Sequence, residues 1–200
     1  MNRRAGLTLV LTVAFLATTA TALLAQSKFD FEATLGYANT GGGYAAIMDG
    51  AIPGEAVIYY GSGAVRATFA ANVASFGLVS AYGEQHWWKV GFSAGVTWFG
   101  SISSKFQPYV QARVGRVNLK PEGEGFGRVG DSFPSIDRIK GWEGSVAAGA
   151  HLWVTPKFGF TASGLFSSYT TGDADLSDVG LEPINSGSGV GFRFGFVFKP

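Results

Sequence analysis

In the last stretch of the chain, residues 187–200, a large apolar side chain occupies every second position from Val190 to Phe198, and the positions between them hold glycine, one cation and one valine. A period of two indicates a β-strand, because successive side chains of a strand point to opposite faces. A soluble protein buries an apolar strand face in a core, whereas a membrane β-barrel turns it outward to lipid. One face of this strand is wholly apolar and consists of Val190, Phe192, Phe194, Phe196 and Phe198.

Composition favours the membrane alternative. Only 14% of the 200 residues are charged, whereas soluble domains have roughly 25%. The chain has 30 glycines and 17 phenylalanines, yet no unbroken apolar run of about 20 residues follows residue 26, so a helical span is not supported there. The chain also has no cysteine, which excludes disulfides and a thiol nucleophile.

The N-terminal residues have the features of an export signal. Arg3 and Arg4 precede an apolar segment, and residues 22–25 offer a cleavage site that ends at Ala25. We therefore predict a cleaved signal peptide over residues 1–25 and one domain over 26–200; the alternative is a retained membrane helix. Cleavage would remove two positive charges from a chain of net charge +1, so the remainder is nearly neutral and nucleic-acid binding is not predicted.

Alternating segments continue along the whole chain and are separated by links of two kinds. Short periplasmic turns and longer extracellular loops are typical of outer-membrane barrels, and we predict an all-β, eight-stranded, antiparallel up-and-down transmembrane β-barrel. The predicted strands are approximately 28–39, 56–70, 74–83, 87–99, 108–119, 142–154, 158–170 and 187–200. The predicted long links are 40–55, 120–141 and 171–186, and the short ones are 71–73, 84–86, 100–107 and 155–157.

Alternation also assigns side chains to the two faces. In the second and third segments we expect Val57, Tyr59 and Phe76 to face lipid. In the fifth segment Arg116 interrupts the outward apolar face. This interruption predicts either a β-bulge near Gly115 or a position for Arg116 at the membrane interface.

Two tryptophans mark the ends of the apolar face in the fourth segment. Trp88 and Trp98 are ten residues apart, which is about 33 Å along a strand. A strand tilted by about 40° would place them roughly 25 Å apart in height, which matches the apolar band of an outer-membrane barrel. We therefore predict that Trp88 and Trp98 belong to its aromatic girdles.

Two pairs of segments resemble a known family. The sequence WKVGFSAGV at 88–96 followed by FQPYVQARVG at 106–115 looks like one hairpin of the small outer-membrane β-barrels, and GWEGSVAAGA at 141–150 followed by TPKFGFTA at 155–162 resembles the next. This family is similar in fold to the transmembrane domain of outer-membrane protein A and includes Gram-negative surface antigens. The resemblance implies an outer-membrane location, insertion by the barrel-assembly machinery, contact with lipid and lipopolysaccharide, and extracellular loops that are available to partners.

The inward faces of the predicted strands carry charges of both signs. An eight-stranded barrel is just wide enough for side chains to fill it, so we expect these charges to form a salt-bridge network that plugs the lumen. Arg193 in the last strand would pair with Glu32 in the first. A gated path for protons or small ions is the alternative. The predicted network consists of Asp30, Glu32, Arg66, Lys89, Arg113, Glu143, His151 and Arg193.

The sequence offers little for other activities. Lipid A-modifying enzymes of the outer membrane are also small barrels that use serine and histidine, but neither His86 nor His151 lies in a His-x-Ser arrangement, and we predict no enzymatic activity. A soluble lipocalin-like barrel would have to enclose all the large aromatic side chains and expose a surface rich in small residues.

The acidic residues of the last long link do not match an EF-hand, and we interpret them as a solvated loop. We therefore predict no metal site. We also predict that the chain has no cofactor and is a monomer. These acidic residues are Asp173, Asp175, Asp178 and Glu182.

Overall fold

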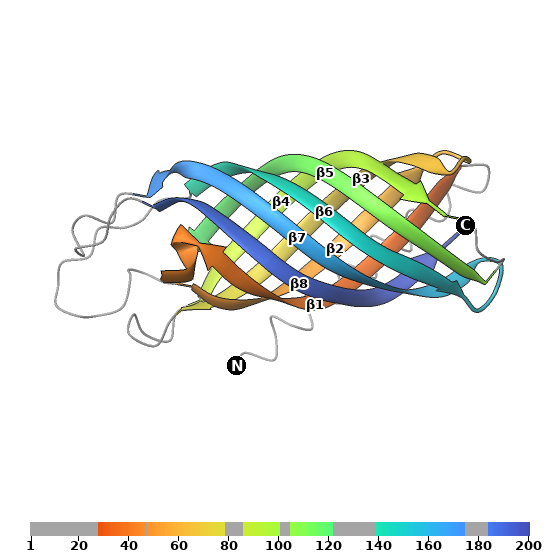
Figure 1. Cartoon of the computed structure of the whole chain (residues 1–200), viewed down its shortest axis with the longest axis horizontal. Coiled ribbons are helices and arrows are strands. Elements are labelled where there is room, and N and C mark those ends of the chain that lie inside the picture. Colours follow the sequence, from red (N-terminus) through yellow and green to blue (C-terminus); the bar gives the residue numbers. More distant parts are fainter. Residues whose placement is uncertain (1–27, 47, 79–85, 101–104, 122–138, 175–183) are drawn as a thin grey trace.

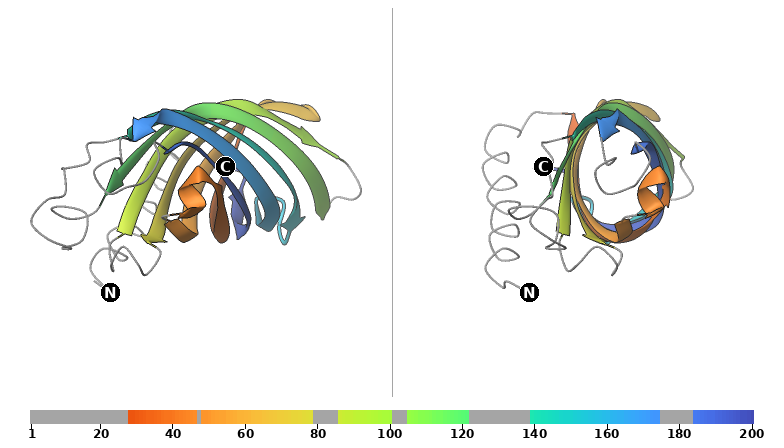
Figure 2. Two further views of the ribbon diagram at one scale, coloured as in Figure 1. Left: turned by 60° about the vertical axis from the view of Figure 1, so that its left-hand side comes forward. Right: turned by 90° about the vertical axis from the view of Figure 1, so that its left-hand side faces the viewer.

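The structure is a computed structural model that describes residues 28–46, 48–78, 86–100, 105–121, 139–174 and 184–200. In this part of the chain, eight antiparallel strands pair in sequence order, and the last strand pairs with the first to close a barrel (Figures 1 and 2). The predicted fold class is confirmed. The strands are β1 (Phe29–Gly42), β2 (Met48–Tyr60), β3 (Val65–Leu78), β4 (His86–Phe99), β5 (Phe106–Pro121), β6 (Ile139–Trp153), β7 (Phe158–Ala174) and β8 (Ile184–Phe198), and a 3₁₀ helix, η1 (Gly43–Ala46), follows β1.

The two ends of the barrel differ in the length of their links. The turn end carries the links 61–64, 100–105 and 154–157 together with the C-terminus (Figure 1). The loop end carries η1 and the longer links 79–85, 122–138 and 175–183. The acidic residues from Asp175 to Glu182 and the predicted signal peptide lie outside the described residues. Among the described residues, no helix is both long enough and apolar enough to cross a membrane.

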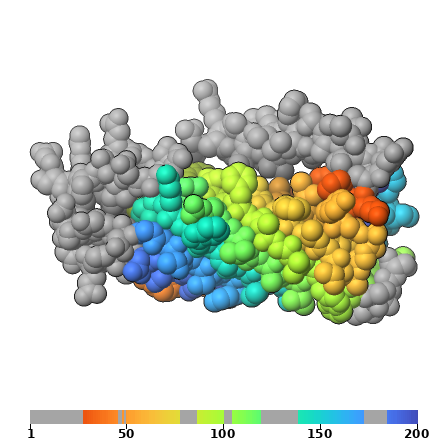
Figure 3. All heavy atoms as spheres, turned by 90° about the horizontal axis from the view of Figure 1, so that it is seen from above, coloured from red at the N-terminus to blue at the C-terminus, as the bar shows by residue number. Residues whose placement is uncertain are grey.

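The outer wall of the barrel is apolar. The alternation of β8 is confirmed, because Phe192, Phe194 and Phe196 are exposed on the outer wall while Arg193 and Val197 are buried inside. The strands follow one another as diagonal bands across this wall (Figure 3). Together their apolar side chains form a belt that lipid, not water, would cover, and the reverse arrangement would be needed for a lipocalin-like interior. Further members of the belt are Leu35, Ile52, Phe69, Phe92, Val96, Val110, Val114, Val146, Leu152, Phe160, Phe166 and Val190.

The predicted boundaries of the second and third strands are wrong. The predicted segment 56–70 contains a turn: β2 ends at Tyr60, and β3 begins at Val65. Gly61 has a φ of 128° in this turn, a region that glycine adopts without the steric cost of a side chain, and its amide donates to the carbonyl of Lys28 at 2.9 Å. The first half of β2 lies in the predicted loop 40–55, and the predicted link 71–73 lies inside β3.

Three residues of these strands lie on the opposite face from the one predicted. Val57 and Tyr59 are 1% and 0% exposed and lie on the inner wall, whereas Tyr60 is 49% exposed. Phe76, at 5% exposure, also faces inward. The turn accounts for Val57 and Tyr59, because from Ala51 on the even-numbered residues of β2 face out, whereas in β3 the odd-numbered ones do. Phe76 was misassigned because β3 continues through the predicted link 71–73 and keeps one phase.

The predicted bulge near Gly115 is absent. Within the described residues, β5 pairs with β4 and β6 without a shift in register, and Gly115 lies opposite Ser93 on one side and Glu143 on the other. Arg116 faces outward, and its guanidinium carbon lies 4.5 Å from the centroid of the Trp142 ring. An aromatic ring therefore accompanies the cation that interrupts the apolar face.

Candidate functional site

The inner wall of the barrel is the candidate functional site. The eight residues of the predicted network come from strands β1, β3, β4, β5, β6 and β8, and all of them point into the lumen because they share the inward phase of their strands. The structure adds Glu55 of β2, which sequence reasoning placed in a loop. In the described part of the chain, no group of three or more His, Cys, Asp or Glu side chains is arranged to hold a metal ion.

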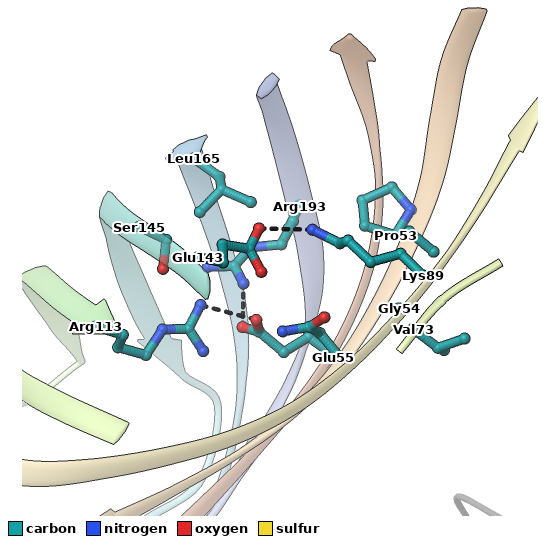
Figure 4. Close-up of a pocket in the computed structure, with 12 residues that line it drawn as sticks. Pro53, Gly54, Glu55, Val73, Lys89, Arg113, Glu143, Ser145, Leu165 and Arg193 are labelled. Carbon is teal, nitrogen blue, oxygen red and sulfur yellow. Dashed lines mark hydrogen bonds and ion pairs between the residues drawn. The ribbon is translucent and has the colours of Figure 1, made fainter. Parts of the chain in front are cut away.

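The centre of the lumen is an Arg–Glu–Arg triad. Glu55 accepts a hydrogen bond from Arg113 Nη2 at 2.8 Å through Oε2, and it accepts one from Arg193 Nη1 through Oε1 (Figure 4). Arg193 Nη2 also donates to Ser163 Oγ at 3.4 Å. All three charged side chains are buried, so each cation depends on the shared carboxylate.

The predicted pair of Arg193 with Glu32 is wrong. On β8, Arg193 lies opposite Gly36 of β1, whereas Glu32 lies opposite Val197. Arg193 is therefore closer to the loop end than Glu32 is, and it reaches Glu55 instead. A cavity of about 30 Å³ beside the triad has room for one or two water molecules.

A second ion pair lies between the triad and the loop end. Lys89 Nζ donates to Glu143 Oε1 at 2.6 Å, and it lies 5.7 Å from the centroid of the Tyr169 ring. Tyr44 of η1 packs against Tyr169 and is hydrogen-bonded to Thr171 Oγ1 at 2.8 Å. Burial raises the pKa of the Tyr44 phenol, so this group stays neutral. The large apolar side chains on the inner wall at this end are Met48, Trp87, Leu119 and Ile139.

Glu32 is the centre of a third cluster, nearer the turn end. Its Oε2 accepts hydrogen bonds from Tyr59 Oη at 2.9 Å and from Thr161 Oγ1 at 3.2 Å. The same oxygen lies 2.8 Å from His151 Nε2. Four aromatic rings surround the buried imidazole, with centroids 4.9 to 5.8 Å away: Tyr59, Phe99, Tyr109 and Trp153.

Two cations lie between this aromatic layer and the turn end of the barrel. Arg66 forms an ion pair with Asp30, and its guanidinium carbon lies 4.7 Å from the centroid of the Phe99 ring. Lys199 Nζ lies 3.7 Å from the centroid of the Trp153 ring. Ion pairs and aromatic rings thus fill the lumen from the triad to the turn end.

Tyr59→Phe is expected to destabilise the barrel by about 1.5–3 kcal/mol, because it removes a buried hydrogen bond to a charged group and keeps the ring. Tyr60→Phe is the matched control, since its phenol is exposed on the outer wall, and it should change stability by less than about 0.5 kcal/mol. Urea unfolding in detergent micelles, followed by tryptophan fluorescence, measures both. A larger loss for Tyr60→Phe would contradict the observed phase of β2.

The predicted girdle residues lie on the outer wall of β4. Trp98 is exposed near the turn end, and Trp88 is half-buried near the loop end. Trp142 and Tyr37 are also exposed near the loop end, and Tyr60 is exposed near the turn end. Aromatic rings therefore stand at both edges of the apolar belt, where the interfaces of a bilayer would lie.

Comparisons with known proteins identify the fold. No family model matches the sequence, and no curated protein matches it. Neisserial surface protein A is 15% identical with a TM-score of 0.59 over 87% of this chain and 98% of that one. The outer membrane protein OprG from Pseudomonas aeruginosa is 12% identical with a TM-score of 0.56 over 86% and 95%. The outer membrane enzyme PagL is 14% identical with a TM-score of 0.50 over 84% and 97%.

These similarities concern the fold, and the belt adds a physical constraint. A closed barrel satisfies its backbone hydrogen bonds internally, and an apolar outer wall with aromatic edges requires a bilayer around it. The belt is therefore suited to a barrel that crosses a membrane, and the solved structures with this fold named above are outer-membrane proteins or surface proteins. The chain has the fold of the small eight-stranded outer-membrane β-barrels.

Proposed function

We propose that this chain is an integral outer-membrane protein with a structural or surface-interaction role, and that its lumen does not conduct ions. The observation that carries the proposal is the filled lumen, in which the Glu55 triad lies between aromatic layers. Because an eight-stranded barrel has little interior volume, these side chains occupy much of it. A porin-like role would need a continuous aqueous path.

The proposal includes no enzymatic activity. The similarity to PagL concerns the fold alone, and function depends on the residues of a site. His151 is buried among aromatic rings at the turn end, and its ring nitrogen Nε2 is engaged by Glu32. A lipid A-modifying enzyme would need its catalytic group near the outer leaflet, which is at the opposite end of this barrel.

The proposed partners follow from the orientation. With the turn end in the periplasm, the longer links 79–85, 122–138 and 175–183 are extracellular and available to surface partners. The belt would contact phospholipid and lipopolysaccharide, and the barrel-assembly machinery would insert the chain. We propose a monomer, because β8 pairs with β1 and the closed sheet offers no strand edge to a second copy.

We expect the refolded chain to give no conductance steps in planar lipid bilayers, because charged and aromatic side chains occupy the lumen. A general porin in the same bilayers is the positive control. In cells, the chain should sediment with the outer membrane and migrate faster on gels when it is not heated, and its expression should leave the mass of lipid A unchanged. Regular conductance steps would overturn the closed lumen, and a new lipid A mass would revive an enzymatic role.

A further inference from the structure

Charges of opposite sign are separated between the two walls of the barrel. Among the side chains that the structure describes, every carboxylate lies on the inner wall: Asp30, Glu32, Glu55 and Glu143. The exposed charged side chains in the same set are all cations. Lys28, Lys105 and Lys157 are at the turn end, whereas Arg116 and Lys140 are near the loop end. The described outer surface therefore presents positive charge at both edges of the apolar belt.

The two cations near the loop end are neighbours on adjacent strands. In the pairing of β5 with β6, Arg116 lies opposite Trp142, and Asn118 lies opposite Lys140. Arg116 and Lys140 are therefore diagonal neighbours on the same face, and diagonal positions are about 7–8 Å apart. Two long cationic side chains at this spacing can hold one anion between their charged ends.

Trp142 orients the first of these cations. The guanidinium carbon of Arg116 lies over its indole, 4.5 Å from the ring centroid, and this cation–π contact restricts where the guanidinium can lie. Trp142 is itself 54% exposed on the outer wall. A guanidinium held in this way is suited to bidentate binding of phosphate.

The depth of the pair selects the kind of ligand. Towards the turn end, the next outward residue on β5 is Val114, and on β6 Gly144 is followed by Val146. Both valines belong to the apolar belt. Along the register, the outer wall continues with the exposed hydroxyl residues Thr170 and Ser186 on the side of β7 and β8. On the side of β4, Arg116 lies opposite Phe92 of the apolar belt. The pair thus lies where the apolar belt gives way to polar side chains, which is the level of lipid headgroups.

We propose that Arg116 and Lys140, with Trp142, form a binding site for a phosphate group of a phosphorylated glycolipid of the outer leaflet, that is, of the lipid A class. The inference rests on the proposed function, because it requires the loop end to face outward. The positive charge of the pair complements the phosphate, and the belt below it accepts the acyl chains. The apolar surroundings weaken screening and strengthen the contact.

Lipid titrations of the folded chain in non-ionic detergent, read by native mass spectrometry, test the site. The ligands are bis-phosphorylated lipid A, its dephosphorylated form and phosphatidylglycerol. The double variant Arg116→Gln/Lys140→Gln is expected to bind bis-phosphorylated lipid A about tenfold more weakly, since two charge-assisted hydrogen-bonding groups are lost. The control Lys28→Gln/Lys157→Gln removes the same charge at the turn end and should bind like the unchanged chain.

Three outcomes would overturn the site: equal weakening in both double variants, equal affinity for dephosphorylated lipid A, or equal affinity for phosphatidylglycerol. The first would indicate a general charge effect, the second a site that does not need phosphate, and the third a phospholipid site. Fractionation separates this failure from that of the proposed function. If only the binding site is wrong, the Arg116/Lys140 variant still sediments with the outer membrane. If the outer-membrane location is wrong, the unchanged chain itself sediments with another fraction.

Discussion

Glu55→Gln is expected to destabilise the folded barrel by about 3–5 kcal/mol, the range found when one partner of a buried ion pair is removed. Glu55 is the carboxylate that contacts both Arg113 and Arg193, and the side chains of all three residues are at most 4% exposed. Glutamine keeps the shape and loses the charge, so both guanidinium groups stay in the lumen without their counter-ion. The loss should therefore exceed that from any single hydrogen bond.

The measurement is the urea midpoint in lipid vesicles, supported by the temperature at which the fast-migrating band disappears on gels. Asp30→Asn is the matched control. Its pair with Arg66 lies at the turn end with both side chains 12% exposed. The loss should be smaller, because this pair is less buried than the triad and its carboxylate pairs with one arginine in place of two. Equal midpoints for Glu55→Gln and the unchanged chain would mean that the triad does not hold the lumen together.

Most of the fold could be predicted because alternation is a local property. In β1, β4, β6, β7 and β8 most outward apolar side chains alternate with small or polar ones, and the structure keeps the predicted faces. Closure of the barrel follows when every strand has one apolar face and neither edge strand can remain unpaired in lipid. The alternation with a period of two residues was therefore sufficient to predict the barrel architecture.

Strand β2 could not be predicted in the same way. Pro53 and Gly54 have the composition of a loop, yet they continue the strand, and Glu55 was lost from the predicted lumen with them. The turn after Tyr60 then changed the phase. A glycine-rich interruption in an alternating segment is therefore a signal that the phase should be assigned again on its far side.

Partners across the lumen depend on register, which the sequence does not encode locally. Glu55 lies opposite Thr34 of β1, and Thr34 lies opposite Gly195 of β8. The pair of Glu55 with Arg193 thus bridges two strands that are not neighbours. Lys140 illustrates the same limit, since sequence reasoning placed it in a loop, and only the pairing of β5 with β6 brings it beside Arg116.

The closing seam between β8 and β1 depends on an inward-facing glycine. Gly195 lies opposite Thr34, and a Cβ atom at this position would overlap the carbonyl oxygen of Ala33. Because that oxygen belongs to the backbone of the paired strand, no side-chain rotation relieves the overlap. The two strands would have to move apart at the place where the barrel closes.

Gly195→Ala is therefore expected to destabilise the barrel by about 1–3 kcal/mol, the usual cost of forcing an extra methyl group into a packed site. Gly164→Ala on β7 is the matched control: it faces outward, and a Cβ there meets no atom within 4 Å. Alanine also restricts the unfolded chain, so the control should be neutral or more stable by about 0.4–1 kcal/mol. Urea midpoints in lipid vesicles give both values. Equal effects of the two substitutions would mean that β8 and β1 do not approach each other this closely, because the close approach of the two backbones is what distinguishes Gly195 from Gly164.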